Sequence, residues 1–273
     1  MNEYVASVIL GIVQGLTEFL PVSSSGHLII TSALLGLEGV RIETFEVVIQ
    51  LGSILAVVVL YWSRFWGLLF PGPVSEGAPV GPRLAGIRGL WLLFLTSLPA
   101  SAVGLLLHKH IKHYLFNPAS VAAALAVGAL FIFFAERKSG ASSARYTSVD
   151  ALTPKLALGI GCFQCLSLWP GFSRSTSTIM GGLLLGANRA VAAEYSFLAA
   201  VPIMVAATGL SLLSAADTLT KADIPFFAIG TAVSFAAALA AIKIFVGLIS
   251  RISFKPFAWY RLAVAPLILW FWM

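Results

Sequence analysis

Two serine-rich breaks interrupt long apolar stretches of this sequence, and they lie 150 residues apart. The first is QGLTEFLPVSSSGH (residues 14–27), and the second is QCLSLWPGFSRSTST (residues 164–178). When residues 11–36 are placed on residues 161–186 without a gap, nine of the 26 positions are identical. Polar groups within a membrane are costly and are usually functional. If the chain is a membrane protein, the repeated break predicts one site that is built from two copies.

The composition establishes that the chain is a membrane protein. Of its 273 residues, 59% are hydrophobic and 10% are charged, whereas a soluble domain has about 25% charged residues. The net charge is +6. Because the basic residues are scattered over the predicted loops, they indicate orientation in a membrane and exclude a nucleic-acid partner.

Six apolar segments are long enough, or nearly so, to cross a bilayer as helices, which takes roughly 20 residues. They are residues 43–63, 88–107, 117–135, 191–212, 224–249 and 257–272. The last segment is short, and aromatic residues near its ends are expected to anchor it.

The two breaks predict helices that turn back within the membrane. Pro21 and Pro170 disfavour a continuous helix, so each segment should divide into two arms. The arms are residues 4–20 and 26–36, then 156–169 and 175–187. An arm of 11 residues is only ~16 Å long, about half of the hydrocarbon core. We therefore expect two re-entrant helical hairpins, whose irregular turns must lie within protein or beside water.

These segments predict an all-α polytopic membrane protein with an inverted-topology repeat. Each half has one re-entrant hairpin plus three transmembrane helices, and three is odd, so the second half is upside down relative to the first. The halves are about 1–135 and 150–273, with a cytoplasmic linker at about 136–155, within a single integral-membrane domain of residues 1–273. The loop 64–87 is also expected to be an irregular linker.

The basic residues predict the orientation. The face that bears the N-terminus (face A) has four: Arg41, Lys109, Lys112 and Lys221. The opposite face (face B) has ten: Arg64, Arg83, Arg88, Arg137, Lys138, Arg145, Lys155, Arg189, Arg251 and Lys255. Lys243 and Arg261 are expected inside helix ends near face B. The positive-inside rule then makes face B cytoplasmic and both termini periplasmic.

Several residues in the breaks suit a phosphate group. Ser25 and Ser175 are expected to cap the helices that restart after each break, so that two helix N-termini point into a shared cavity. Free N–H groups at helix N-termini bind anions. Arg174 adds a planar guanidinium that matches phosphate oxygens.

Glu18 and His27 flank the first serine run and suggest chemistry beyond binding. A carboxylate, a histidine and a serine within reach of each other form a set of orienting group, base and nucleophile. The alternative is that Glu18 pairs with Arg174 for structural reasons, since buried charges need partners. Glu46 and Gln50 either line the cavity or bond another helix.

The motifs QGLTEFLPVSSSGH and PGFSRSTST resemble the two signatures of the bacterial undecaprenyl-diphosphatase family, the bacitracin-resistance membrane phosphatases. The resemblance extends to TFEVVIQLGSILAVVV (44–59) and RISFKPFAWYR (251–261). It implies hydrolysis of undecaprenyl diphosphate to undecaprenyl phosphate and inorganic phosphate, which recycles the lipid carrier for cell-wall synthesis. It also implies a bacterial inner-membrane location and a site that opens to the periplasm.

The resemblance also implies roles for individual residues. Together with the helix ends described above, it gives Glu18, Ser24, His27 and Arg174 as the predicted catalytic residues. The predicted substrate-binding residues are Gln14, Ser23, Ser25, Ser173, Ser175 and Thr178. Ser24 would attack the terminal phosphorus while His27, oriented by Glu18, takes its proton; His27 as the direct nucleophile stays open. The family is associated with Mg²⁺ or Ca²⁺, for which Glu18 is a candidate ligand, but Gln14 stands where a second carboxylate would help to bind the ion.

A transporter or lipid flippase is the alternative from a different class, because inverted repeats with broken helices and a midplane phosphate site recur there. Transport does not require Glu18, Ser24 and His27 together, and this set therefore favours the phosphatase.

Overall fold

The computed structural model describes residues 2–72, 83–139, 144–249 and 251–272, which fold into helices joined by short loops, with no β-strand among them. The first half contains α1 (Glu3–Thr17), α2 (Ser24–Leu34), α3 (Val40–Val48), α4 (Gln50–Leu60), α5 (Trp62–Leu69), α6 (Gly86–Leu115) and α7 (Pro118–Lys138). The second half contains α8 (Pro154–Gln164), α9 (Arg174–Leu184), α10 (Arg189–Ser214), α11 (Ile224–Ile249) and α12 (Lys255–Trp272). Short 3-10 helices are η2 (Val149–Ala151), η3 (Cys165–Leu168) and η4 (Lys221–Asp223).

Within the described residues, five helical segments are long and apolar enough to cross a membrane. They are Val40–Leu60, Gly86–Leu107, Pro118–Lys138, Arg189–Ser214 and Lys221–Ile249, and they correspond to five of the six predicted crossings. The sixth, α12, is a helix as predicted but does not meet this standard. It contains Lys255 and Arg261 within 18 residues, and it packs along α7.

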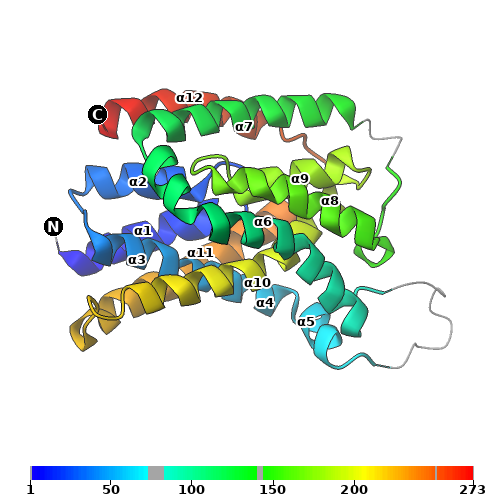
Figure 1. Cartoon of the computed structure of the whole chain (residues 1–273), viewed down its shortest axis with the longest axis horizontal. Helices are drawn as coiled ribbons and strands as arrows, with labels where there is room; N and C mark the ends of the chain where they lie inside the picture. The colour runs from blue at the N-terminus through cyan, green and yellow to red at the C-terminus, as the bar shows by residue number, and fades with distance from the viewer. Residues whose placement is uncertain (1, 73–82, 140–143, 250, 273) are drawn as a thin grey trace.

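The four predicted arms form short helices, and neither break is helical throughout. The first break separates α1 from α2, and the second separates α8 and η3 from α9. In Figure 1, the pair α1–α2 lies toward the end that carries both termini, and the pair α8–α9 lies toward the other end. The broken ends of the two pairs therefore approach each other in the interior.

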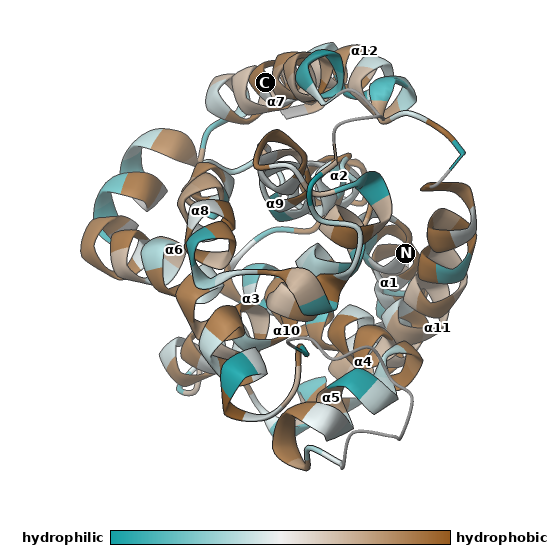
Figure 2. Ribbon diagram, turned by 90° about the vertical axis from the view of Figure 1, so that its right-hand side faces the viewer, coloured by the Kyte–Doolittle hydropathy of each residue, from teal (hydrophilic) through white to brown (hydrophobic). Residues whose placement is uncertain are grey.

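The first helix of each pair packs along a helix from the other half of the chain. The helix α1 lies along α11, and α8 lies along α6. Seen from the end in Figure 2, α2 and α9 lie between α7 with α12 on one side and α4 with α10 on the other. The contact between α1 and α11 is so close that a Cβ on Gly15 would lie 2.4 Å from the carbonyl oxygen of Ser234. Glycine at this position allows the two helix backbones to approach closely.

The main hydrophobic core lies next to the first break. Phe19 is buried against Phe197 of α10, with the rings edge to face and their centroids 5.2 Å apart. Tyr195 and Phe245 are buried in the same cluster. The polar turn that follows Phe19 is thus held against a rigid apolar wall.

The predicted loops contain more helix than expected. Residues 64–69 of the predicted loop 64–87 form most of α5, which begins at Trp62 in the predicted crossing 43–63, and α7 extends to Lys138 into the predicted linker. The reason is that Trp62, Phe65, Trp66, Leu68 and Leu69 give α5 an apolar face. Parts of these two loops, residues 73–82 and 140–143, lie outside the described residues.

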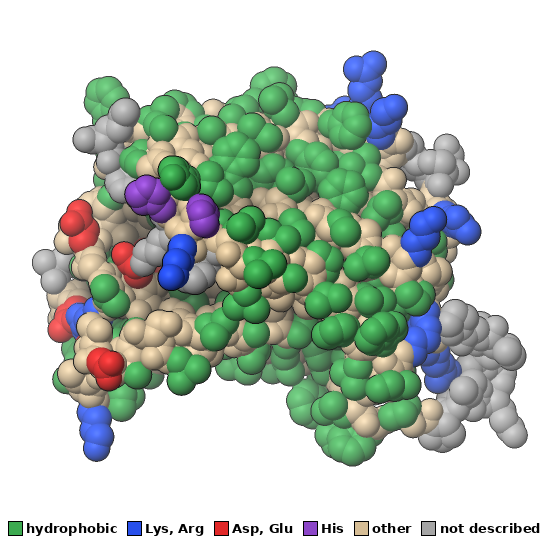
Figure 3. Space-filling view, in the orientation of Figure 1, with side chains coloured by type: hydrophobic (Ala, Val, Ile, Leu, Met, Phe, Trp, Pro, Cys, Tyr) green, Lys and Arg blue, Asp and Glu red, His purple; other side chains and the backbone are tan. Residues whose placement is uncertain are grey.

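The surface has the character of a membrane protein. In Figure 3, hydrophobic side chains cover the middle of the visible face, while most of the visible Lys and Arg side chains gather at the end opposite the termini. Such a band, with charges displaced to the ends, matches a bilayer core between two polar interfaces.

Candidate active site

Both breaks use a serine in an unusual backbone conformation. Among the described residues, Ser23 (φ 74°) and Ser173 (φ 80°) are the non-glycine residues with positive φ, and they are equivalent in the sequence repeat. Their side chains cap the following helices, because Ser23 Oγ accepts from the Gly26 N–H at 3.3 Å and Ser173 Oγ accepts from the Thr176 N–H at 3.2 Å. Strain of this kind persists where the surroundings enforce it, often at functional sites.

The predicted caps, Ser25 and Ser175, are therefore wrong by two residues. The positive φ at Ser23 and Ser173 places the sharp turn there, so each helix begins at the next residue. The helix N-termini still face the break, as expected.

The two breaks enclose a cavity of about 120 Å³. It is lined by Glu18, Ser23, Ser24, Ser25, Gln50, Ser167, Pro170, Gly171, Ser173, Arg174 and Met204. Residues from both halves of the chain thus form one site, as the repeat predicted. Of the two possibilities for Gln50, lining the cavity is confirmed, whereas Glu46 accepts from Ser32 Oγ at 2.5 Å.

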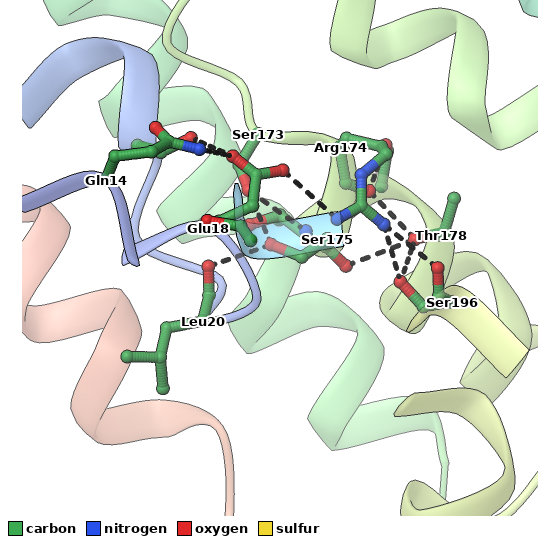
Figure 4. Close-up of polar contacts among 12 residues, drawn as sticks. Gln14, Glu18, Leu20, Ser173, Arg174, Ser175, Thr178 and Ser196 are labelled. Atoms are coloured by element: carbon green, nitrogen blue, oxygen red, sulfur yellow. Dashed lines mark hydrogen bonds and ion pairs between the residues drawn. The ribbon is translucent and has the colours of Figure 1, made fainter. Parts of the chain in front are cut away.

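The carboxylate of Glu18 is the centre of the polar network in Figure 4. Its Oε2 accepts from Ser24 Oγ at 2.7 Å and from Gln14 Nε2 at 2.9 Å, and its Oε1 accepts from Arg174 Nη2 at 3.2 Å. Only 7% of Glu18 is exposed. A hydroxyl that donates to a buried carboxylate has the geometry of a nucleophile beside its general base.

The guanidinium of Arg174 is fixed from two sides. Nη2 binds Glu18, while Nη1 donates to the carbonyl oxygen of Ser196 at 2.9 Å and to its Oγ at 3.3 Å. Nε is buried and has no hydrogen-bond partner within the described part of the chain. Arg174 therefore combines a fixed orientation with a donor that is still free.

Three predicted binding residues lie behind the cavity and do not line it. Thr178 is buried and shares a 2.7 Å hydrogen bond with Ser196, next to Arg174. Ser175 donates to the carbonyl oxygen of Leu20 at 2.8 Å and so ties the second break to the first. Gln14 is buried against Glu18. These side chains hold the groups that face the cavity (Figure 4).

His27 does not take the predicted place between Glu18 and Ser24. Its Nδ1 lies 2.7 Å from the carbonyl oxygen of Ser23, and its Nε2 lies 2.6 Å from the hydroxyl of Tyr260. Because a carbonyl can only accept, Nδ1 carries a proton, and in the neutral ring Nε2 accepts from Tyr260. Glu18 contacts Ser24 directly, whereas His27 supports the strained peptide of Ser23 from behind.

Arg261 is the functional-site residue that sequence reasoning placed wrongly. It was expected near face B, but it is fully buried between the two breaks. Its guanidinium donates to Thr176 Oγ1 and to the main-chain carbonyl groups of Pro21, Ala124, Leu125, Gly171 and Phe172, at 2.9–3.3 Å. None of its hydrogen-bond partners in the described residues is a carboxylate. The family motif at residues 251–261 indicated that this segment matters, but nothing in the motif showed the direction of the Arg261 side chain.

The residues present do not form a site for a divalent cation by themselves. Both oxygens of Glu18 already accept from Arg174, Ser24 and Gln14. Gln14 Oε1 is buried without a partner in the described residues, but a neutral amide oxygen does not replace the missing second carboxylate. In the part of the chain that the structure describes, no group of three His, Cys, Asp or Glu side chains could hold a metal.

Fold and site together define a multi-pass helical membrane protein with a polar, arginine-containing cavity between two broken helices. Comparison with protein families matches residues 7–267 to the family described as bacitracin resistance protein BacA. Similar proteins named undecaprenyl-diphosphatase come from Maridesulfovibrio salexigens (62% identity over 272 residues, 100% of each chain) and Nitratidesulfovibrio vulgaris strain DP4 (61% over 271 residues, 99% of each). Another with that name, from Lawsonia intracellularis, is 53% identical over 265 residues, 97% of each chain. The chain belongs to the BacA family.

Proposed function

We propose that the protein is an undecaprenyl-diphosphatase of the bacterial inner membrane. It hydrolyses the anhydride of undecaprenyl diphosphate and yields undecaprenyl phosphate and inorganic phosphate. The observation that carries the proposal is the hydrogen bond from Ser24 to the Glu18 carboxylate, in a cavity that Arg174 also lines. Relatives with this name over nearly the full length support it.

The proposed chemistry begins at Ser24. Its Oγ attacks the terminal phosphorus while Glu18 accepts the proton, and the bond from that phosphorus to the bridging oxygen breaks. Undecaprenyl phosphate leaves with the proton that Glu18 had accepted, and the phosphoryl group stays on Ser24. Water then attacks this phosphoserine while the ionised Glu18 accepts its proton. That proton passes to Ser24 Oγ as the bond to phosphorus breaks and inorganic phosphate is released.

The charge of the interior supports a phosphate substrate. Arg261 is buried and Arg174 is largely buried, and Glu18 is the one carboxylate among the described partners of these two cations. The N-termini of α2 and α9 add the positive ends of two helix dipoles. A diphosphate would complete the charge balance, and charge that develops on the transferring phosphoryl group would be stabilised by Arg174.

His27 fits a positioning role better than that of nucleophile. Both of its ring nitrogens are engaged, by Ser23 and Tyr260. Through the Ser23 carbonyl it holds the peptide that aims Ser24 at the cavity. Tyr260 in turn holds the His27 ring, and the planes of the two rings lie at 5° to each other.

We also propose the inverted-topology repeat and the predicted orientation. The equivalence of Ser23 and Ser173 and the reciprocal packing of α1 on α11 and α8 on α6 support the repeat. The charge asymmetry of ten to four and the shared end of both termini in Figure 1 support cytoplasmic loops at the opposite end. The first break would then open to the periplasm, with the lipid chain between helices.

The direct test is phosphate release from undecaprenyl diphosphate by the purified protein in detergent. We expect turnover with the wild-type protein and almost none with Ser24→Ala. A wild-type protein that binds the lipid without releasing phosphate would instead favour transport.

A further inference from the structure

A second polar cavity lies between α5, the start of α6 and η2. Its volume is about 640 Å³, and it shares none of its described lining residues with the cavity around Glu18. Three arginines, Arg64, Arg83 and Arg88, line it together with Asp150. Its place is at the end of the molecule opposite the termini (Figure 1).

One wall of this cavity is held by Asp150. Its carboxylate accepts from Arg64 Nη1, at 3.0 Å to each oxygen, and from the Leu84 N–H at 2.8 Å. Burial raises the pKa of Asp150, but the Leu84 N–H and the charges of Arg64 and Arg83 outweigh it and hold that pKa below its usual value. Arg64 therefore lies between two carboxylates, because its Nε is also 3.4 Å from Glu194 Oε1, and Asp150 fixes the segment that precedes α6.

Three arginines face two carboxylates here, Asp150 and Glu194, which leaves an excess of positive charge. Arg88 donates to the carbonyl groups of Arg83 and Leu152, which are neutral. The guanidinium of Arg83 makes no hydrogen bond with a residue that the structure describes, and its charge acts on Asp150. The N-terminus of α6 adds to this field, because its N-cap is Ala85, which supplies no side-chain cap and lines the cavity. The cavity thus suits an anion.

The adjacent helix indicates the depth of this cavity in the membrane. Along α5 and just after it, Trp62, Trp66 and Phe70 are exposed by 58%, 51% and 58%. Successive ring centroids lie 5.8 Å and 4.6 Å apart. Such aromatic rows lie at the level of lipid head groups. Arg64 and Gly67 line the cavity from the same helix, so the cavity lies at that level too.

We infer that this cavity binds the phosphate of a lipid head group from the leaflet at that end, with the lipid chains beside Trp62, Trp66 and Phe70. Arginine guanidinium groups bind phosphate oxygens with charge-assisted hydrogen bonds. A volume of about 640 Å³ holds a phosphate and its ester substituent. The alternative is that these arginines only set the orientation of the protein in the membrane. That role would require neither a cavity nor a wall fixed by Asp150. The inference does not rest on the proposed phosphatase activity.

Native mass spectrometry of the full-length protein in neutral detergent tests this site, with short-chain phosphatidylglycerol as the lipid probe and inorganic phosphate as the competing ion. The variant is Arg83→Gln, because the Arg83 guanidinium makes no hydrogen bond with a described residue. The matched control is Arg137→Gln, which removes one exposed charge near the same end but outside the cavity. Phosphate release is measured in parallel and should be unchanged in both variants. A failure of the proposed phosphatase activity can then be distinguished from a failure of lipid binding.

We expect Arg83→Gln to weaken phosphatidylglycerol binding about tenfold, the effect of losing one charge-assisted hydrogen bond, and Arg137→Gln to leave it unchanged. Equal effects of the two variants would show general surface charge and overturn the site, as would unchanged binding by Arg83→Gln. Strong displacement of the lipid by inorganic phosphate would show a site for the free ion and overturn the lipid assignment.

Discussion

Arg174 Nη2 lies 3.2 Å from Glu18 Oε1, although the two residues are 156 positions apart in the sequence. The other oxygen of the same carboxylate accepts from Ser24 Oγ at 2.7 Å. One buried carboxylate thus connects the hydroxyl of the first break to the guanidinium of the second. The sequence left two roles open for Glu18, a structural ion pair with Arg174 and a part in the chemistry. The observed geometry is compatible with both roles at once.

Arg174→Lys should strongly impair phosphate release. Lysine keeps the charge but has no planar fork with which to reach Glu18 and the Ser196 carbonyl together. Losing one such stabilising contact typically lowers the rate by about 10²–10³. The control is Arg189→Lys, whose guanidinium binds Glu136 at 2.7–3.0 Å outside the cavity. Near-normal turnover by Arg174→Lys would exclude a bidentate role.

Substitutions at His27 and Tyr260 should separate positioning from direct catalysis. We expect His27→Ala to lower kcat with little change in KM, and Tyr260→Phe to do the same more weakly, because Ser23 keeps its contact with the ring. If His27 were the nucleophile, His27→Ala would abolish turnover and Ser24→Ala would not. A steady-state comparison of the three variants decides between the two roles.

Arg261→Met should destabilise the protein. The change leaves five main-chain carbonyl groups and the Thr176 hydroxyl without the donor that Arg261 supplies, and a single buried polar group left unsatisfied costs about 1–3 kcal/mol. Thermal unfolding in detergent should show a clear drop in Tm. Arg251→Gln, at an exposed position near the start of α12, is the control. An unchanged Tm for Arg261→Met would mean that Arg261 does not hold the breaks together.

The orientation can be tested with single cysteines in a chain that lacks Cys162 and Cys165. Cysteines at positions 75 and 142, which lie outside the described residues, should resist a membrane-impermeant thiol reagent in intact cells. Glu38→Cys, in the exposed loop between α2 and α3, should be labelled. Labelling at 75 or 142 with protection at 38 would reverse the orientation.

Much of the fold could be predicted from the sequence, because apolar length and proline are local signals. The arms on both sides of each break and most crossings are confirmed for this reason. The pairing of the two breaks also followed from their repeat. The exception is α5, where aromatic residues form an amphipathic helix in a segment that was largely predicted to be an irregular linker.

The site was predicted less completely, because side-chain direction depends on distant contacts. Ser24 and Arg174 line the cavity as expected, but Thr178 faces Ser196 and not the cavity. His27 turns to Tyr260, which is 233 residues away. Nothing local in the sequence indicates such a partner. Positive φ at a serine is likewise set by the surrounding fold, which explains the error in the helix caps.

The most direct test of the account measures phosphate release and lipid diphosphate binding by Ser24→Ala beside the wild type. The control is Ser214→Ala, whose hydroxyl binds a carbonyl group at the exposed end of α10. Because a nucleophile acts in the chemical step, we expect Ser24→Ala to lose turnover while its affinity for the lipid diphosphate stays close to that of the wild type. Near-normal phosphate release by Ser24→Ala would contradict the account, since the Glu18-bound hydroxyl could not then be the attacking group.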